Sequence, residues 1–276
     1  MRKWTIALLS SAAVLAAWSY AAGATARALP LADGWTRLPS GLDLGTFTVD
    51  RTPTHGDGRM VVVRVDQARF ELVAYTASAD GETRTAREWV GDTPGVLAAT
   101  NASMYEPDQR TASSLLVAGG HINNPTLSAD NAVLAFGGTA PARIVDRTCQ
   151  EFEAVRPLYP SLIQGIRMLG CDGANVWEEQ PRRWSEAAIG QSANGDILFL
   201  FARTPWSAHA FVEHARGLEL ELVRLQHADG GPPAQVAWRD GAATVELIGS
   251  YETDSRHDDL RVDAVAVPNL VGIRAR

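Results

Sequence analysis

The chain has 276 residues, with 25 basic and 32 acidic side chains and a formal net charge of −7. With 46% hydrophobic residues it can bury a packed core, and it is too apolar to be intrinsically disordered. The acidic balance argues against a nucleic-acid-binding protein, because phosphate contacts need a dense basic face. Lys3 is the only lysine. A mature chain without it cannot form a lysine Schiff base or carry a GK[ST] phosphate loop.

The N-terminus has the layout of a secretory signal peptide. Arg2 and Lys3 precede an apolar run that ends in the small residues Ala24-Thr25-Ala26. We expect cleavage after Ala26, which assigns residues 1–26 to the signal peptide. The alternative is an uncleaved membrane anchor, but the run is rich in alanine and serine rather than leucine. Cleavage predicts a protein exported to the periplasm or the extracellular space, with no membrane segment remaining.

The two cysteines, Cys149 and Cys171, are 22 positions apart, and such a pair in an exported protein predicts a disulfide. The alternative is two buried free thiols. His209 and His214 are five positions apart, which misses the spacing of two metal ligands on one helix face. We therefore expect no metal site, while calcium stays open as a cofactor. The sequence does not indicate the oligomeric state.

Short β-branched or alternating segments, bounded by Gly, Pro, Asn or Asp, recur along most of the chain. They predict strands at Met60–Val65, Glu71–Ala77, Val96–Thr100, Ser114–Ala118, Ala132–Phe136, Asp196–Ala202, Leu220–Gln226, Gln235–Trp238, Thr244–Ile248 and Val262–Val267. Residues 27–58 are rich in Pro, Gly, Thr and Asp and are set apart as an N-terminal extension. Residues 59–276 are expected to form one domain.

Two helices are predicted from their capping residues. Thr85 is the expected N-cap of a helix Ala86–Val90, and Ser207 that of a helix Ala208–Arg216 which ends at Gly217. In the second helix four apolar residues recur with helical spacing and predict its buried face: Ala208, Phe211, Val212 and Ala215. Few helices among many strands predict an α+β fold, a single mixed, β-rich domain with a few helices packed on the sheet.

The strongest local indication of a site is the segment Gln226–Pro233, which reads Gln-His-Ala-Asp-Gly-Gly-Pro-Pro and follows an apolar strand. Alternation along the strand predicts that His227 and Asp229 share one face. A carboxylate beside glycines lets a ligand approach the backbone closely, and a nearby imidazole can share protons. The alternative is an ordinary turn built on Asp-Gly.

Three further segments carry candidate side chains. Glu186 lies where a strand begins, just after two arginines, and the alternative is a solvated acid beside those arginines. The loop from Arg203 to His209 leads into the second helix and is typical of an anion-binding site at a helix N-terminus. An ordinary capped helix has the same features. Asn101 follows a predicted strand, where asparagine also serves as a turn former.

Several segments, taken in order, resemble the phosphodiester glycosidase family over about residues 60–273. They are Thr85–Trp89, Asn101–Tyr105, Leu162–Arg167, Ala188–Gly190, Gly195–Leu198, Gln226–Gly231 and Val267–Gly272. The resemblance implies a mixed α/β domain that cleaves a sugar from a phosphodiester-linked partner, with its site at strand ends. The aspartate and glycines of the family's Leu-Asp-Gly-Gly element correspond to Asp229, Gly230 and Gly231. The asparagine of its Asn-Gly-Gly-Phe-like element corresponds to Asn101.

The chain departs from the family pattern at two places. Family members usually have an arginine shortly before the Ala-Ile-Gly strand, where this chain has Glu186 or nearby Arg183. They also have a serine after the Asp-Gly-Gly, where this chain has Pro232-Pro233. The segments Trp184–Ala188 and Arg203–His209 indicate a divergent bacterial branch. Because the arginine and the serine are plausible phosphate contacts, the alternative function is a catalytically inactive glycan- or phosphate-binding module, and an envelope scaffold is a third.

The leading expectation is an exported glycosidase that acts on a sugar 1-phosphodiester or a related cell-envelope glycan. Glycosidic cleavage passes through an oxocarbenium-like state and usually needs two carboxylates in different protonation states. The expected pair is Asp229 and Glu186, with His227 as a proton partner. Electrostatic support from Arg203 or Arg167 would replace part of the general acid for a phosphate leaving group. The other expected substrate contacts are Asn101, Gln164, His209, Gly230 and Gly231.

Overall fold

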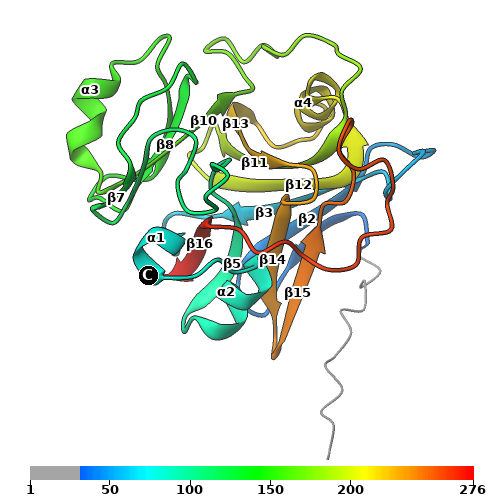
Figure 1. Cartoon of the computed structure of the whole chain (residues 1–276), viewed down its shortest axis with the longest axis horizontal. Coiled ribbons are helices and arrows are strands. Elements are labelled where there is room, and N and C mark those ends of the chain that lie inside the picture. Colours follow the sequence, from blue (N-terminus) through cyan, green and yellow to red (C-terminus); the bar gives the residue numbers. More distant parts are fainter. Residues whose placement is uncertain (1–31) are drawn as a thin grey trace, which may run out of the picture.

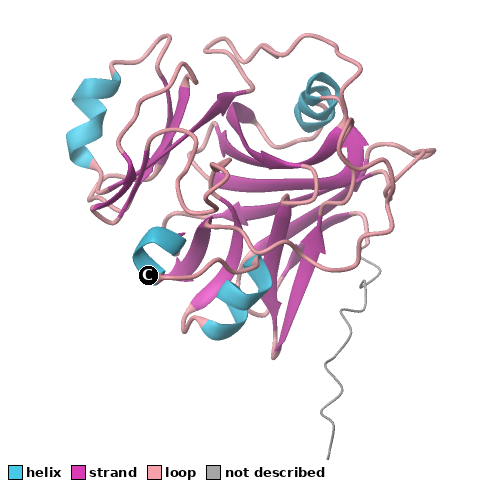
Figure 2. Cartoon of the chain, viewed as in Figure 1, coloured by secondary structure: helices cyan, strands magenta, loops and turns pink. Residues whose placement is uncertain are grey.

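The computed structural model describes residues 32–276 (Figure 1). The predicted signal peptide, residues 1–26, lies outside the described residues. In the described part the chain is mostly β, with strands that pair antiparallel in two sheets (Figure 2), so the fold has more strand than the predicted α+β class implies. No helix within residues 32–276 is long and apolar enough to span a bilayer.

The larger sheet has eleven strands within the described residues, and its main path runs β1-β2-β3-β12-β11-β13-β10-β6-β7. Beside this path, β8 pairs with β10 and β9 pairs with β8. The strands are β1 Gly34–Arg37, β2 Asp43–Thr48, β3 Arg59–Val65, β6 Leu116–Ala118, β7 His121–Asn124, β8 Ala132–Phe136, β9 Arg143–Asp146, β10 Ser161–Arg167, β11 Trp184–Ser192, β12 Ile197–Trp206 and β13 Leu222–Gly230. β1 and β2 come from the range 27–58 and extend the sheet from β3.

The smaller sheet has the order β15-β14-β5-β16-β4. Its strands are β4 Phe70–Thr76, β5 Val96–Asn101, β14 Gln235–Asp240, β15 Ala243–Ile248 and β16 Asn269–Ala275. The predicted strand Val262–Val267 is wrong, because Val262 is 85% exposed and only Val267 makes an isolated bridge. The regular strand begins after Pro268, where the apolar residues of β16 become buried between β5 and β4.

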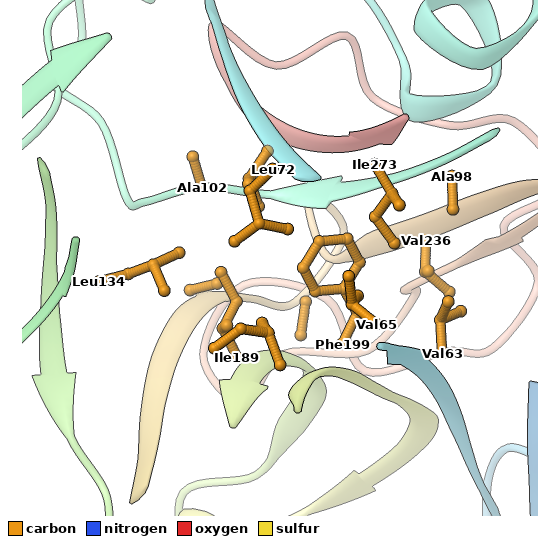
Figure 3. Close-up of a cluster of buried hydrophobic side chains, with 14 of the residues drawn as sticks. Val63, Val65, Leu72, Ala98, Ala102, Leu134, Ile189, Phe199, Val236 and Ile273 are labelled. Carbon is orange, nitrogen blue, oxygen red and sulfur yellow. The ribbon is translucent and has the colours of Figure 1, made fainter. Parts of the chain in front are cut away.

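The main hydrophobic core lies between the two sheets (Figure 3). Strands β3, β11 and β12 contribute Val63, Ile189 and Phe199, and the smaller sheet contributes Val236 and Ile273 from the other side. Successive side chains of a strand point to opposite faces, so the alternate residues of β3 belong to a second cluster on the outer face. The larger sheet is therefore buried on both faces where it supports the site.

Helix α4, Ala208–Arg216, covers the outer face of β11 and β12. The predicted cap is confirmed, because the Ser207 hydroxyl accepts a hydrogen bond from Ala210 N. The four residues of the predicted apolar face are all buried. The helix ends at Gly217 as predicted, with a right-handed φ of −72° rather than the left-handed conformation of many glycine caps.

Helix α2, Ala86–Asp92, packs on the outer face of the smaller sheet. Its predicted N-cap is confirmed as a capping box, in which Thr85 and Glu88 bond each other's backbone N–H groups. Trp89 and Val90 are buried against the sheet, as expected. The short helical segments that complete the fold are α1 Ala77–Asp80, α3 Phe152–Val155 and the 3-10 turn Arg156–Leu158.

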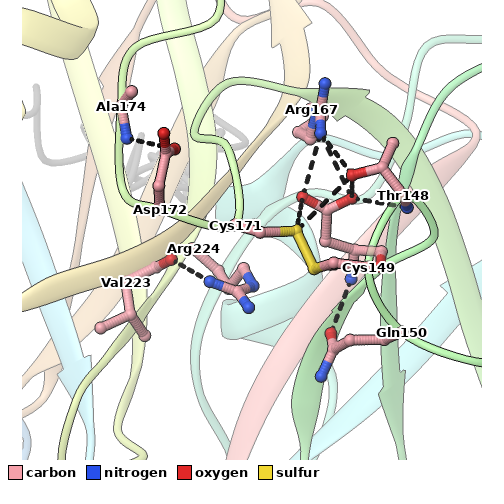
Figure 4. The surroundings of a disulfide bond; sticks show 10 residues. Thr148, Cys149, Gln150, Arg167, Cys171, Asp172, Ala174, Val223 and Arg224 are labelled. Atoms are coloured by element: carbon pink, nitrogen blue, oxygen red, sulfur yellow. Dashed lines mark hydrogen bonds and ion pairs between the residues drawn. A yellow bond between two sulfur atoms is a disulfide. The ribbon is translucent and has the colours of Figure 1, made fainter.

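The predicted disulfide between Cys149 and Cys171 is confirmed and joins the loop after β9 to the loop after β10 (Figure 4). Beside it, Nη1 of Arg167 lies 3.2 Å from Oδ2 of Asp146 and donates to the Thr148 hydroxyl at 2.7 Å. Burial alone would raise the pKa of Asp146, but hydrogen bonds from Thr148 and Arg167 outweigh burial and lower it. These contacts fix the end of β10, which pairs with β13.

Candidate active site

Glu186 and His227 form a buried pair at the centre of the site. Nδ1 of His227 lies 2.5 Å from Oε1 of Glu186, and the two side chains are 6% and 2% exposed. The indole Nε1 of Trp184 donates to Oε2 of Glu186 at 2.6 Å. Burial alone would lower the pKa of His227, but the charge and hydrogen bond of Glu186, together with the charges of Asp229 and Asp130, outweigh burial and raise it. The pair therefore favours a protonated imidazole at His227.

A β-bulge between β11 and β13 sets the directions of the side chains of His227 and Asp229. In the antiparallel pair of β11 and β13, Ala188 lies opposite His227 and the preceding Ala187 lies opposite Asp229. Two residues of β11 thus oppose three of β13, and Ala228 is the extra residue, packed in the main core. This irregularity breaks the strict alternation from which His227 and Asp229 were predicted to share one face.

Asp229 is 7% exposed and has a different environment from Glu186. Its Oδ1 accepts a hydrogen bond from Gly230 N at 2.9 Å, and its Oδ2 accepts one from Nδ2 of Asn101 at 3.4 Å. Burial raises the pKa of Asp229 to about 7, and the negative charges of Glu186 and Glu252 add to the rise. The carboxyl of Asp229 therefore keeps its proton in weakly acidic solution.

Asn101 ties the smaller sheet to the site. It is the last residue of β5 and is fully buried. Besides its contact with Asp229, its Nδ2 donates to Pro233 O at 3.0 Å and its Oδ1 accepts from Gln235 N at 2.7 Å. The predicted neighbours Asn101, Asp229, Glu186 and His227 thus do come together, where the two sheets meet.

The two glycines after Asp229 are covered by other side chains. A Cβ at Gly230 would lie 2.5 Å from Cδ1 of Trp184, and one at Gly231 would lie 2.9 Å from Oε2 of Glu252. Gly231 also has a left-handed φ of +68°, which favours glycine. The expectation that these glycines let a ligand approach the backbone is therefore corrected. They make room for Trp184 and Glu252.

Gln164 reaches the site through a small polar pocket. The pocket is lined by Ser103, Met104, Ser113, Ser114, Asp130, Gln164, Gly165 and His227. The side chain of Gln164 accepts hydrogen bonds from Leu115 N and Ser128 N, so much of its capacity is used inside the protein. The buried hydroxyl of Ser103 has no hydrogen-bond partner among the described residues. This pocket therefore offers a polar recess beside His227.

Arg203 was expected to support a leaving group, but its guanidinium has other partners. Its Nε lies 2.6 Å from Oδ1 of Asp259. Its two terminal nitrogens donate to the carbonyls of Ile248, Asp259 and Arg261 at 2.9 to 3.1 Å. Arg203 thus clamps the loop that follows β15.

Arg167 and His209 also have internal partners. The guanidinium of Arg167 is paired with Asp146 beside the disulfide. Nδ1 of His209 lies 2.7 Å from the carbonyl oxygen of Trp177, so the imidazole is tied to a neighbouring loop instead of an anion-binding site. Among residues 32–276, the His, Cys, Asp and Glu side chains grouped closely enough for a metal ion are Asp146, Cys149 and Cys171, and the disulfide uses both sulfurs.

Trp184 and Glu252 were not among the predicted site residues. Trp184 precedes Glu186 by two positions in a strand, so period-two alternation would have placed both on one face. Glu252 lies in a loop and reaches the site through contacts between distant segments, for which the sequence carries no local signal. Tyr105 is a further neighbour, because burial and the charge of Asp229 raise its pKa.

The fold and the site define an antiparallel β protein with acidic residues buried at the junction of its sheets. The model of the phosphodiester glycosidase family matches residues 94–274, and the chain belongs to this family. Among curated proteins, none matches its sequence.

Two solved structures have a similar fold. One is the catalytic domain of zebrafish N-acetylglucosamine-1-phosphodiester alpha-N-acetylglucosaminidase, auto-inhibited by its pro-peptide, with a TM-score of 0.61 and 11% identity over 89% of this chain and 87% of that one. The other is a hypothetical protein from Synechocystis, with a TM-score of 0.56 and 13% identity over 85% of this chain and 62% of that one. At these identities the likeness concerns the fold alone.

Proposed function

We propose that the protein is an exported glycosidase that cleaves a sugar from a sugar 1-phosphodiester or a related cell-envelope glycan. The observation that carries the proposal is the contrast between two buried carboxyls. Glu186 is paired with His227, whereas the pKa of Asp229 is raised to about 7. Glycoside hydrolysis uses such a pair, one carboxyl as a proton donor and the other as an anion. Membership of the phosphodiester glycosidase family supports the hydrolase class.

Asp229 is the general acid in this proposal. An acid must hold its proton when the substrate binds, and the buried environment meets this condition up to about pH 7. As the glycosidic bond breaks, the carboxyl of Asp229 gives its proton to the leaving-group oxygen, and water forms the new bond to the anomeric carbon and releases a proton that restores the acid. A phosphate leaving group needs less of this help than an alcohol, because phosphate is the weaker base.

Glu186 is the anionic partner. Its two oxygens are held by His227 and Trp184, so its direction is set before the substrate binds. A negative charge fixed in a water-poor site stabilises the positive charge that develops on the sugar ring. In this proposal the polar pocket beside His227 binds sugar hydroxyls, whereas Asn101, which was expected to bind substrate, is buried and holds Asp229 and Pro233.

A catalytically inactive module that binds glycans or phosphate is the second candidate. It is favoured by the arginines, because Arg167 and Arg203 are both held in internal ion pairs. It is also favoured by Pro232-Pro233, which stands where family members have a serine. This candidate predicts saturable binding of anionic glycans without product.

The test is sugar release by the purified mature chain, residues 27–276, from a panel of N-acetylhexosamine 1-phosphodiesters and neutral N-acetylhexosaminides. The Asp229→Asn and Glu186→Gln variants are expected to lose at least about 100-fold in rate, the usual contribution of a positioned acid or base. Asp254→Asn, which removes an exposed charge, is the matched control and should keep the activity. A folded wild-type protein that binds these sugars but releases none would favour the binding module.

A further inference from the structure

The loop that follows β15 carries a carboxylate that the proposed mechanism does not use. Glu252 is half-buried, and its carboxylate has no hydrogen-bond or ion-pair partner in the described part of the chain. Its side chain lies against Gly231, two residues beyond Asp229. Its backbone forms an isolated antiparallel bridge with Trp184, the residue that holds Glu186. An unpaired acid therefore adjoins the two proposed reacting carboxyls.

The protein fixes this loop firmly. Arg203 binds the carbonyls of Ile248, before Glu252, and of Asp259 and Arg261, after it. The Ser185 hydroxyl donates to the Arg203 carbonyl at 2.7 Å and accepts from Ser250 N at 3.0 Å.

Two like charges close together disfavour each other's ionisation, so placing an unpaired glutamate beside Asp229 opposes folding when both are ionised. The anchoring of the loop by Arg203 and Ser185 offsets this cost.

We propose that Glu252 is a positioning residue that keeps Asp229 protonated for its task as an acid. The inference rests on the proposed function, in which Asp229 is the general acid. A second negative charge nearby makes loss of the Asp229 proton less favourable. The groups that face Asp229 are His227 and the N–H of Gly230 from β13, Glu186 from β11, Asn101 from β5, Tyr105 from the loop after β5, and Glu252.

These neighbours act in opposite directions on the pKa of Asp229. Burial has the largest effect and raises the pKa. The charge of His227 and the hydrogen bond from Gly230 N lower it, whereas the charges of Glu186 and Glu252 raise it. The charge of Glu186 is paired with His227, whereas that of Glu252 is unpaired in the described residues. Glu252 is therefore the acid whose charge can be removed without leaving a buried partner unpaired.

The test follows the carboxyl signal of Asp229 by NMR titration of protein labelled with ¹³C at aspartate, assigned with Asp229→Asn. In wild type Asp229 should titrate at about 7. In Glu252→Gln the midpoint should fall below that of wild type, while burial of Asp229 keeps it above the ordinary aspartate range. Glu252→Asp keeps the charge, so its midpoint should stay closer to that of wild type than the midpoint of Glu252→Gln. Thermal unfolding confirms that each variant is folded.

Asp254→Asn is the matched control, because it removes one charge from the same loop at an exposed position. Asp254 has a left-handed φ of +69°, which asparagine tolerates. If the titration midpoint of Asp229 in Glu252→Gln equals that in the control, at about 7, the inference is overturned. The titration needs no substrate, so a shift without any turnover would refute the proposed function and leave the coupling between Glu252 and Asp229 standing.

Discussion

Nδ1 of His227 lies 2.5 Å from Oε1 of Glu186, and the indole of Trp184 donates to the other oxygen of the same carboxylate. The residues come from two neighbouring strands, β11 and β13, that are packed on both faces. With both oxygens held, the carboxylate of Glu186 has little freedom to rotate. Its orientation is therefore part of the fold and does not have to be established by the substrate.

Replacing Trp184 by phenylalanine tests this orientation. The change leaves Oε2 of Glu186 without its donor, and a hydrogen bond to a charged group contributes about 1.5–3 kcal/mol. We expect kcat for sugar release to fall about 10- to 100-fold. Trp35→Phe is the control, because this indole lies on strand β1 against Phe47 and Arg64 and has no contact with Trp184 or Glu186 among the described residues. Equal losses in the two variants would contradict a specific role for Trp184.

The raised pKa of Asp229 predicts that its ionised form destabilises the protein. The pKa is about 7 in the folded chain against an ordinary 3.8, so the penalty is absent below about pH 4, grows between the two values and is complete above pH 7. Asp229→Asn should therefore stabilise the protein at pH 8, by at most about 4 kcal/mol, and not at pH 4. Urea unfolding at both pH values measures this. Equal effects at the two pH values would contradict the raised pKa.

Gly230→Ala should damage the site through Trp184. The new Cβ would lie 2.5 Å from Cδ1 of the indole, so the ring must move away from Glu186. Overpacking of this kind costs about 1–3 kcal/mol, and activity should fall as it does in Trp184→Phe. Gly91→Ala is the control, because a Cβ at Gly91 meets nothing within 4 Å in helix α2. Wild-type kcat in Gly230→Ala would show that Trp184 does not orient Glu186.

The disulfide should support stability and not the chemistry. Its sulfurs lie beside Asp146 and Arg167, and neither cysteine contacts Glu186 or Asp229 in the described residues. Replacing Cys149 and Cys171 by serine removes a link across 22 positions, worth about 3 kcal/mol. The unfolding midpoint should fall while kcat below that midpoint is kept. A loss of kcat in a variant that is still folded would show that the disulfide is needed to maintain the geometry of the active site.

Local signals predicted the two longer helices, α2 and α4, and many of the strands. Thr85 and Ser207 cap their helices as expected, because a cap and an apolar stripe depend only on neighbouring residues. The predicted strand Ala132–Phe136 coincides with β8. The three side chains predicted near Asp229, which are Asn101, Glu186 and His227, were found because each lies near a strand end.

What the sequence could not supply depends on contacts between distant segments. Arg203 was expected in the site as a free charge, but its partner Asp259 lies 56 positions further along the chain. Glu252 reaches the site only through the loop that Arg203 holds. The alternation of Val262–Val267 is typical of a strand, yet Val262 is exposed, and the strand between β5 and β4 is β16, which begins at Asn269.

The pH dependence of sugar release tests the central claim most directly. If Asp229 is the general acid, kcat/KM of the wild-type protein should fall as the pH rises through about 7, because the carboxyl loses the proton that it must donate. Asp229→Asn should be slow throughout and lack this limb. A wild-type rate that does not change between pH 6 and pH 8, or an Asp229→Asn variant as fast as wild type, would contradict the assignment of Asp229.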